Sequence, residues 1–196
     1  MGKQMIISVG REFGSGGHEI AMKLAERLGL NFYDRKMLDE LAEKKNISIE
    51  YLEKYDEKPR KLFGARKVRS YSNSMEEIVA EMQFDYIEEK ADSGESFVIV
   101  GRCAEAVLKG RESLISIFIL GNKEEKKQRV MERYQLGEQE ALLKMKRHDY
   151  TRKHYHNRHA DSKWGDSRTY ELCINSSYLG VDKTVDILEH YIRERM

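Results

Sequence analysis

Short apolar runs and helical stripes of apolar residues follow one another along the whole chain. A continuous apolar run indicates a strand, and apolar residues three or four positions apart indicate one face of a helix. The runs predict strands at residues 5–9, 31–34, 96–100, 114–120 and 171–175. Helical stripes separate them, at residues 18–28, at 35–45, from 74 past 86, after 122 and at 181–192. Four of the five strands read as apolar runs and not as alternations of apolar and polar residues, which is typical of a parallel sheet covered by helices on both faces.

Capping residues mark where several of these helices begin or end. Ser74 is expected to begin the long middle helix, with Glu77 at the third helical position as in a capping box. Asn122 is expected to cap the helix after the fourth strand, and Gly29 to end the first helix. Residues 46–73 fit neither pattern, so we expect them to form irregular or short helical material inserted over one face.

Polar and glycine-rich residues follow four of the predicted strands. They lie at residues 10–18, at 34–35, at 101–102 and after 120. Ligands of open parallel sheets bind beyond the carboxyl ends of the strands, where these segments would meet. The sequence therefore predicts one binding site built from all four segments.

A glycine cluster stands between the first strand and the first helix, in ISVGREFGSGGHEIAMKLAERLG (residues 7–29). Its four glycines would let the backbone turn sharply, and the following helix would add unpaired amides and a positive dipole end. We expect this loop to bind phosphates through Gly14, Ser15, Gly16, Gly17 and His18. A glycine-rich turn that binds no ligand is the alternative. Compared with the pattern GxxxxGK[ST], Arg11 replaces the first glycine, Gly17 the lysine and His18 the hydroxyl residue.

Composition and charge mainly exclude other classes of protein. The 196 residues suit a single domain, and no apolar run has membrane-spanning length. A net charge of +1 argues against a general nucleic-acid-binding surface. The two cysteines, Cys103 and Cys173, form no CxxC motif, and the N-terminal residues lack signal-peptide architecture, so we expect a cytoplasmic location. Small-molecule nucleotides are the expected partners, and the oligomeric state stays open.

Five segments in order resemble the cytidylate kinase-like family: REFGSGGHEIAMKLAERLG, FYDR, VIVGR, RHDYTR and WGDSRTYELCINSS. The resemblance covers essentially the full chain. It implies one α/β domain over residues 1–196, a three-layer α/β/α P-loop NTPase fold with a five-stranded parallel sheet. It implies a helical acceptor-binding insert at 46–73 and a lid at 137–168. The implied activity is transfer of the γ-phosphoryl group of ATP, with Mg²⁺, to a nucleoside monophosphate such as CMP or dCMP.

The resemblance also assigns residues to the two substrates. It implies donor phosphates at the glycine loop and an acceptor near Asp34, Arg35 and Arg102. It fails at Cys103, where the family has an aspartate, and at Gly17 and His18, where the lysine and the metal-binding hydroxyl are absent. The Mg²⁺ ligands therefore stay unassigned. Asp34 could equally cap the helix that follows it.

Arginines supply the charge that phosphoryl transfer requires. We expect catalytic roles for Arg11, Arg102 and Arg152, with Asp149 orienting Arg152 through an ion pair. Further donor-phosphate contacts are predicted for Arg129, Arg133, Arg147 and Arg158. Arg129 and Arg133 could instead belong to a solvated helix face. In the insert, Arg60, Arg66 and Arg69 remain alternatives as acceptor contacts.

The segment KMKRHDYTRKHYHNRH (residues 144–159) is dense in cations and holds one acid. Such a segment repels itself and is expected to close around an anion, as a lid does. Its histidines 154, 156 and 159 match no standard zinc spacing. We expect Cys103 to be a buried filler rather than a reactive thiol, and Cys173 to lie in the core.

The missing lysine decides between classes of function. Loss of one preorganised charge raises an activation free energy by about 3–4 kcal/mol. Either Arg11 replaces the lysine electrostatically, or catalysis is lost and the chain is a nucleotide-binding sensor. A kinase for a non-nucleotide acceptor is a third hypothesis. The cluster of lid arginines favours an enzyme.

Overall fold

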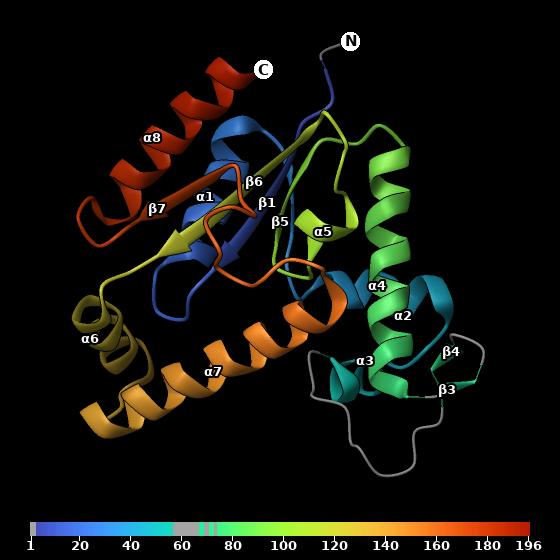
Figure 1. The fold of residues 1–196 in the computed structure, drawn as a ribbon, viewed down its shortest axis with the longest axis horizontal. Coiled ribbons are helices and arrows are strands. Elements are labelled where there is room, and N and C mark those ends of the chain that lie inside the picture. Colours follow the sequence, from blue (N-terminus) through green and yellow to red (C-terminus); the bar gives the residue numbers. More distant parts are fainter. Residues whose placement is uncertain (1–2, 57–66, 69–70, 73) are drawn as a thin grey trace.

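The computed structural model describes residues 3–56, 67–68, 71–72 and 74–196 (Figure 1). Its main sheet contains five parallel strands in the order β2-β5-β1-β6-β7. The strands are β1 (Ile6–Arg11), β2 (Asn31–Tyr33), β5 (Phe97–Val100), β6 (Leu114–Leu120) and β7 (Leu172–Asn175). Each lies within two residues of its predicted position, and the predicted α/β fold is confirmed.

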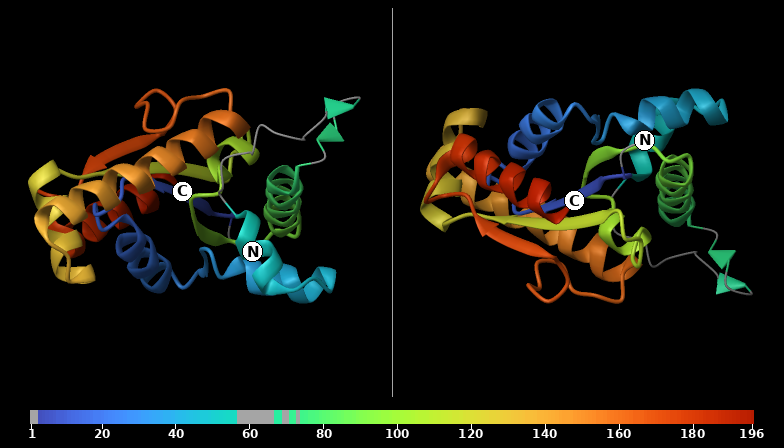
Figure 2. Two further views of the ribbon diagram at one scale, coloured as in Figure 1. Left: turned by 90° about the horizontal axis from the view of Figure 1, so that it is seen from below. Right: turned by 90° about the horizontal axis from the view of Figure 1, so that it is seen from above.

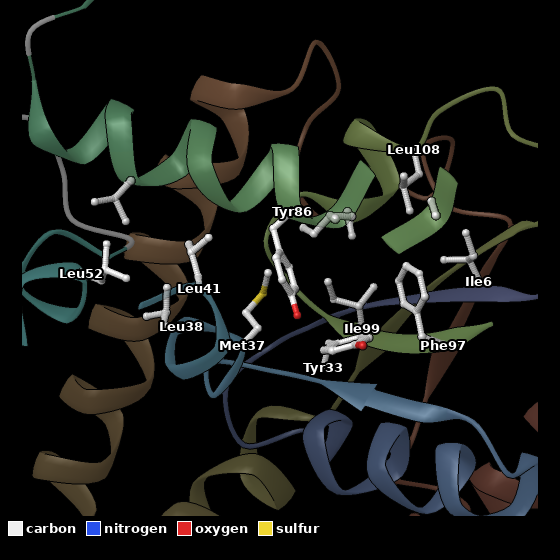
Figure 3. Close-up of a cluster of buried hydrophobic side chains, with 14 of the residues drawn as sticks. Ile6, Tyr33, Met37, Leu38, Leu41, Leu52, Tyr86, Phe97, Ile99 and Leu108 are labelled. Carbon is white, nitrogen blue, oxygen red and sulfur yellow. The ribbon is translucent and has the colours of Figure 1, made fainter. Parts of the chain in front are cut away.

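Alternate residues of the central strands face two different cores. Ile7, Val9 and Val98 pack against the helices α1 (Gly17–Leu28) and α8 (Gly180–Arg195). Ile6 and Ile99 belong to the opposite cluster, with α2 (Met37–Lys45), α3 (Ile49–Tyr55), α4 (Met75–Asp92) and α5 (Ala104–Val107). Because both faces are covered, the central strands are mostly apolar on both sides. Figure 3 shows the second cluster, in which the Tyr33 ring meets the Tyr86 ring edge-on with centroids 6.3 Å apart.

The remaining helices, α6 (Lys123–Tyr134) and α7 (Glu138–His159), lie at the carboxyl ends of the strands. Figure 1 shows α7 running across the end toward which the strand arrows point. In both views of Figure 2, α1 and α7 lie on opposite sides of the central strands. No helix among the described residues is long and apolar enough to cross a bilayer.

Helix ends follow the predicted caps in two cases out of three. Gly29 has a left-handed φ of 65° and its amide donates to the carbonyls of the last turn of α1. The Ser74 hydroxyl accepts a hydrogen bond from the Glu77 amide at 3.3 Å. The prediction for Asn122 is wrong in part, because it occupies the N-cap position but its side chain makes no capping bond. Its Oδ1 instead accepts from Nδ2 of Asn175, 2.9 Å away, because β7 ends beside it.

Two segments differ from a plain helix-and-strand alternation. In the predicted insert the structure places α3 and an antiparallel pair, β3 (Lys67–Val68) and β4 (Tyr71–Ser72). The candidate residues Arg60, Arg66 and Arg69 lie outside the described residues. In the predicted lid, α7 is one continuous helix of 22 residues, which the charged sequence did not indicate. Its closure on a ligand remains a prediction.

Candidate functional site

Two adjoining clefts open at the carboxyl ends of the strands. The smaller has a volume of about 220 Å³ and lies over the glycine loop, between α1 and α6. The larger has a volume of about 1100 Å³ and lies between the loop, the ends of β2 and β5, α3 and α7. Three side chains line both clefts, namely Arg11, His18 and Arg152. The four polar segments that follow the predicted strands thus meet in one place.

The glycine loop turns sharply from β1 into α1. Gly14 and Gly16 have left-handed φ values of 86° and 79°, and α1 begins directly afterwards at Gly17. The smaller cleft is lined by four of the five residues predicted to bind phosphate, Gly14, Gly16, Gly17 and His18. Ser15 differs because its hydroxyl is buried, donating to the Glu12 carbonyl and accepting from the Gly17 amide. Its side chain therefore stabilises the loop and does not line the cleft.

The carboxylates of Glu12 and Asp149 hold the glycine loop in place, a role that the sequence did not predict for either. Glu12 accepts hydrogen bonds from the Gly121 amide and from Nζ of Lys126, at 3.1 and 2.8 Å, and so ties the loop to β6 and α6. Asp149 accepts from the Phe13 amide at 2.7 Å, which ties the loop to α7. Burial raises the pKa of Asp149, although the Phe13 amide and the charges of Lys126 and Arg152 oppose the change. The hydrogen bond from the Phe13 amide thus gives Asp149 a role in fixing the loop, and Arg152 acts on its pKa through its charge.

Arginines converge on the loop from two helices. Nη1 of Arg129 donates to the Gly14 carbonyl at 3.1 Å, and Arg129 and Arg133 both line the smaller cleft. Nη1 of Arg152 donates to the Arg11 carbonyl at 3.3 Å, and its guanidinium lies over the Phe13 ring, 5.5 Å from the centroid. These side chains place positive charge on both sides of the α1 N-terminus, where a polyphosphate would lie.

The other two lid arginines are placed differently. Arg147 lines the larger cleft. Arg158 forms an ion pair with Glu77 of α4 and is absent from the linings of both clefts. It follows Arg152 by six residues, which is about 9 Å along the axis of α7, and the capping turn of α4 holds it there. The structure therefore does not bring Arg158 to the predicted phosphate site.

The turn after β5 carries the predicted acceptor arginine in an unusual backbone. Gly101, Arg102 and Cys103 have consecutive left-handed φ values of 78°, 59° and 53°. For residues other than glycine this conformation costs on the order of 1–3 kcal/mol, and it is concentrated at functional sites. Arg102 is only 4% exposed and forms an ion pair with Asp56, whose side chain is 5% exposed.

Asp56 was missed by sequence reasoning. Besides Arg102, its carboxylate contacts Nε2 of Gln83 at 3.1 Å and Nε of Arg35 at 3.5 Å. Asp56 directly follows α3 in the polar insert, where one acid among many basic and acidic neighbours carries no distinguishing pattern. Arg35, Asp56 and Arg102 all line the larger cleft, so the predicted acceptor residues do come together.

Asp34 bonds the backbone just before α2 and also faces the larger cleft. Its Oδ1 accepts a hydrogen bond from the Lys36 amide at 2.8 Å, at the start of α2, and its Oδ2 lies 2.8 Å from Nε2 of His18. Burial alone would raise the pKa of Asp34, but the hydrogen bonds from His18 and Lys36 outweigh it and lower the pKa. The carboxylate is therefore ionised at neutral pH, and it lines the larger cleft.

The predictions for the two cysteines and the histidines of α7 concern their burial and a candidate metal site. Cys103 is buried, as predicted, whereas Cys173 is only half-buried, because its strand β7 lies at the sheet edge. Within the described part of the chain no group of three or more His, Cys, Asp or Glu residues is arranged to hold a metal ion. His156 is buried, with Nε2 2.6 Å from the Glu105 carboxylate.

Comparison with known proteins places the chain among kinase-like proteins. A family model described as the cytidylate kinase-like family matches residues 6–178. The crystal structure of an uncharacterized protein from Eubacterium ventriosum ATCC 27560 is 42% identical, with a TM-score of 0.77, and covers 97% of this chain and 99% of that chain. No curated protein matches.

More distant structures share the fold alone. A shikimate kinase from Bacteroides thetaiotaomicron is 11% identical, with a TM-score of 0.56, and covers 96% of this chain and 98% of its own. A gluconokinase from Sinorhizobium meliloti 1021 is 12% identical, with a TM-score of 0.55, and covers 99% of this chain and 94% of its own. The five-stranded sheet and its helices thus have the same fold as these two kinases.

Proposed function

Because this chain belongs to the cytidylate kinase-like family, we propose that it transfers the γ-phosphoryl group of ATP to a nucleoside monophosphate, CMP or dCMP. The observation that supports this most is that two clefts adjoin and share Arg11 and Arg152. Phosphoryl transfer requires two substrates in line and positive charge where they meet. A donor over the loop and an acceptor in the larger cleft would meet beside these two guanidinium groups.

In this proposal each substrate has its own set of contacts. The amides at the start of α1, together with Arg129 and Arg133, bind the donor phosphates. Arg102 and Arg35 bind the acceptor phosphate, because a planar guanidinium suits a phosphate well. Arg147 and Arg152, on α7, cover the junction and exclude water that would otherwise hydrolyse the donor.

Mg²⁺ is expected to arrive with ATP, and when bound it neutralises charge on the β- and γ-phosphates. It commonly keeps several water ligands and binds through one or two carboxylates plus substrate phosphates. The described residues fit that mode, since Asp34 presents an ionised carboxylate to the cleft beside the loop. Asp34 is therefore one carboxylate that would hold the ion or its water shell.

A panel of monophosphates tests the proposal. We expect CMP or dCMP with ATP and Mg²⁺ to release ADP in a coupled assay, and the same nucleotides to raise the melting temperature. Nucleotide binding without ADP release for any acceptor would instead select the nucleotide-binding sensor. Absence of both would refute the proposal.

A second candidate function, a kinase for an alcohol, is favoured by the contact between His18 and Asp34. An ionised carboxylate at Nε2 favours the tautomer in which Nε2 carries the proton and Nδ1 carries a lone pair. Since His18 lines both clefts, Nδ1 could accept the proton of an acceptor hydroxyl while its oxygen bonds to the γ-phosphorus and ADP leaves. A monophosphate oxygen is already ionised and needs no such base.

The His18→Gln variant separates the two acceptors, because its amide can still donate to Asp34 but cannot accept the proton. With an alcohol acceptor, chosen from sugars and hydroxy acids, kcat is expected to fall about 10²- to 10⁴-fold. With a monophosphate acceptor we expect a change below about tenfold, since no proton is transferred. Equal loss with every active acceptor would show that His18 acts on the donor phosphates instead.

A further inference from the structure

The Arg11 side chain fills the space that a side chain at position 17 would need. A Cβ atom built on Gly17 would lie 2.5 Å from Cβ of Arg11 and 3.1 Å from its Cγ. A contact of 2.5 Å is far inside the van der Waals distance of two carbon atoms. Arg11 and Gly17 are two of the three positions at which the loop departs from GxxxxGK[ST], the third being His18; arginine stands in place of the first glycine, and glycine in place of the lysine.

The backbone of Gly17 gives no other reason for glycine. Gly17 is the first residue of α1, and its φ is not among the left-handed values found in the described residues. Most residue types form a helix more readily than glycine does. The next nearest atom to the added Cβ is Cβ of Ile119, at 3.2 Å. The absence of a side chain at 17 thus follows chiefly from the presence of Arg11.

The guanidinium of Arg11 extends from the loop to the turn after β5. A Cβ built on Gly101 would lie 3.3 Å from Cζ of Arg11, so the guanidinium rests against the backbone of this turn. Gly101 directly precedes Arg102, the predicted acceptor arginine. Arg11 also lines both clefts. Its charge therefore lies at the boundary of the donor and acceptor sites.

We infer that Arg11 and Gly17 are a reciprocal exchange. The cation of the phosphate loop has moved from position 17, where the pattern has lysine, to position 11, where the pattern has glycine. The inference rests on the proposed phosphoryl transfer. Arg11 is then a catalytic residue whose guanidinium contacts the transferred phosphoryl group, and Gly17 is the space that its stem requires. A planar guanidinium presents several donors in a fixed arrangement and can contact oxygens of two groups at once. A lysine ammonium is a compact point charge without that fixed arrangement.

A thermodynamic cycle tests the steric part without any substrate. Gly17→Ala is expected to lower the melting temperature of the wild-type protein, because the new methyl group meets Arg11. In the Arg11→Gly background the same substitution should raise it, because alanine favours a helix over glycine. The melting temperatures of the four proteins give the result, and the same sign in both backgrounds would overturn the exchange.

The catalytic role of Arg11 is tested by returning the cation from position 11 to position 17. Arg11→Gly is expected to lower kcat about 100- to 1000-fold. The double variant Arg11→Gly/Gly17→Lys should regain at least tenfold over Arg11→Gly, whereas Gly17→Lys alone should be impaired by the clash. A double variant that folds, binds ADP as measured by calorimetry, and is no faster than Arg11→Gly would refute the catalytic role.

The two readouts also distinguish this inference from the proposed function. If the wild-type protein phosphorylates no acceptor, the proposed function fails. The exchange is then judged on the melting temperatures and on the affinity for ADP and for inorganic triphosphate. We expect Arg11→Gly to weaken triphosphate binding at least tenfold, and the double variant to restore part of it. Unchanged triphosphate affinity in Arg11→Gly would show that Arg11 contacts no phosphate.

Discussion

Replacing Arg152 with alanine is expected to lower kcat about 100- to 1000-fold, the effect of removing one preorganised charge from a transition state. Arg152 lines both clefts and donates to the Arg11 carbonyl. Its guanidinium also rests on the Phe13 ring, so its position is fixed before any substrate binds. The measurement is the steady-state rate of ADP release with saturating ATP and the acceptor that proves active.

Lys153→Ala is the matched control for this variant. Lys153 is the next residue on α7, carries the same charge and is exposed. Its removal changes the net charge equally but removes no cation from the lining of either cleft. We expect a kcat within about twofold of the wild type, since exposed charges are screened by solvent. Similar losses in both variants would show that α7 acts through its overall charge, and would exclude a specific role for Arg152.

Most of the fold could be predicted because the hydrophobic pattern and the tertiary structure agree. The run LISIFIL is a strand over its full length, and the stripe Val181, Val185, Leu188 and Ile192 lies on the inner side of α8. The Asn122 cap could not be predicted correctly, because its competitor, Asn175, is far away in sequence and comes close only when β7 joins the sheet.

The helix α7 escaped prediction for a different reason. Its buried positions are few, chiefly Ala141, Met145, Tyr155 and His156, and they do not form a continuous apolar stripe. Part of its inner face is polar because it meets the loop and the cleft: Asp149 holds the Phe13 amide and His148 stacks on the Phe13 ring. A helix that packs on a binding site thus shows less of the periodicity by which helices are recognised.

The site was predictable where one segment carries the whole signal. The glycine loop and Arg102 follow strands, and strand ends converge in a parallel sheet. The sequence did not predict the contacts of three acids, Glu12, Asp56 and Glu105. Each of them pairs with a residue more than 40 positions away in sequence. The steric conflict between Arg11 and any side chain at position 17 could not be predicted either, because it depends on how closely the two backbones approach in the folded chain.

Removing the carboxylate of Asp56 is expected to cost about 3–5 kcal/mol of the free energy of unfolding, the range for breaking a buried ion pair by deleting one partner. Both side chains of the pair are about 95% buried, with exposures of 4% for Arg102 and 5% for Asp56. Asp56→Ala leaves the buried guanidinium without this counter-charge and also removes the acceptor for Gln83. Urea unfolding followed by circular dichroism measures the difference from the wild type.

Glu53→Ala is the control, because Glu53 lines the same cleft but is half exposed and pairs with Arg35 at the surface. Its loss should change the unfolding free energy by less than about 1 kcal/mol. If Arg102 is the acceptor-phosphate ligand, an anionic acceptor supplies the charge that Asp56→Ala lacks. CMP or phosphate should then raise the melting temperature of Asp56→Ala by more than that of the wild type. A large destabilisation that no anion reverses would assign the pair to the stability of the fold and move the acceptor phosphate to another cation of the cleft.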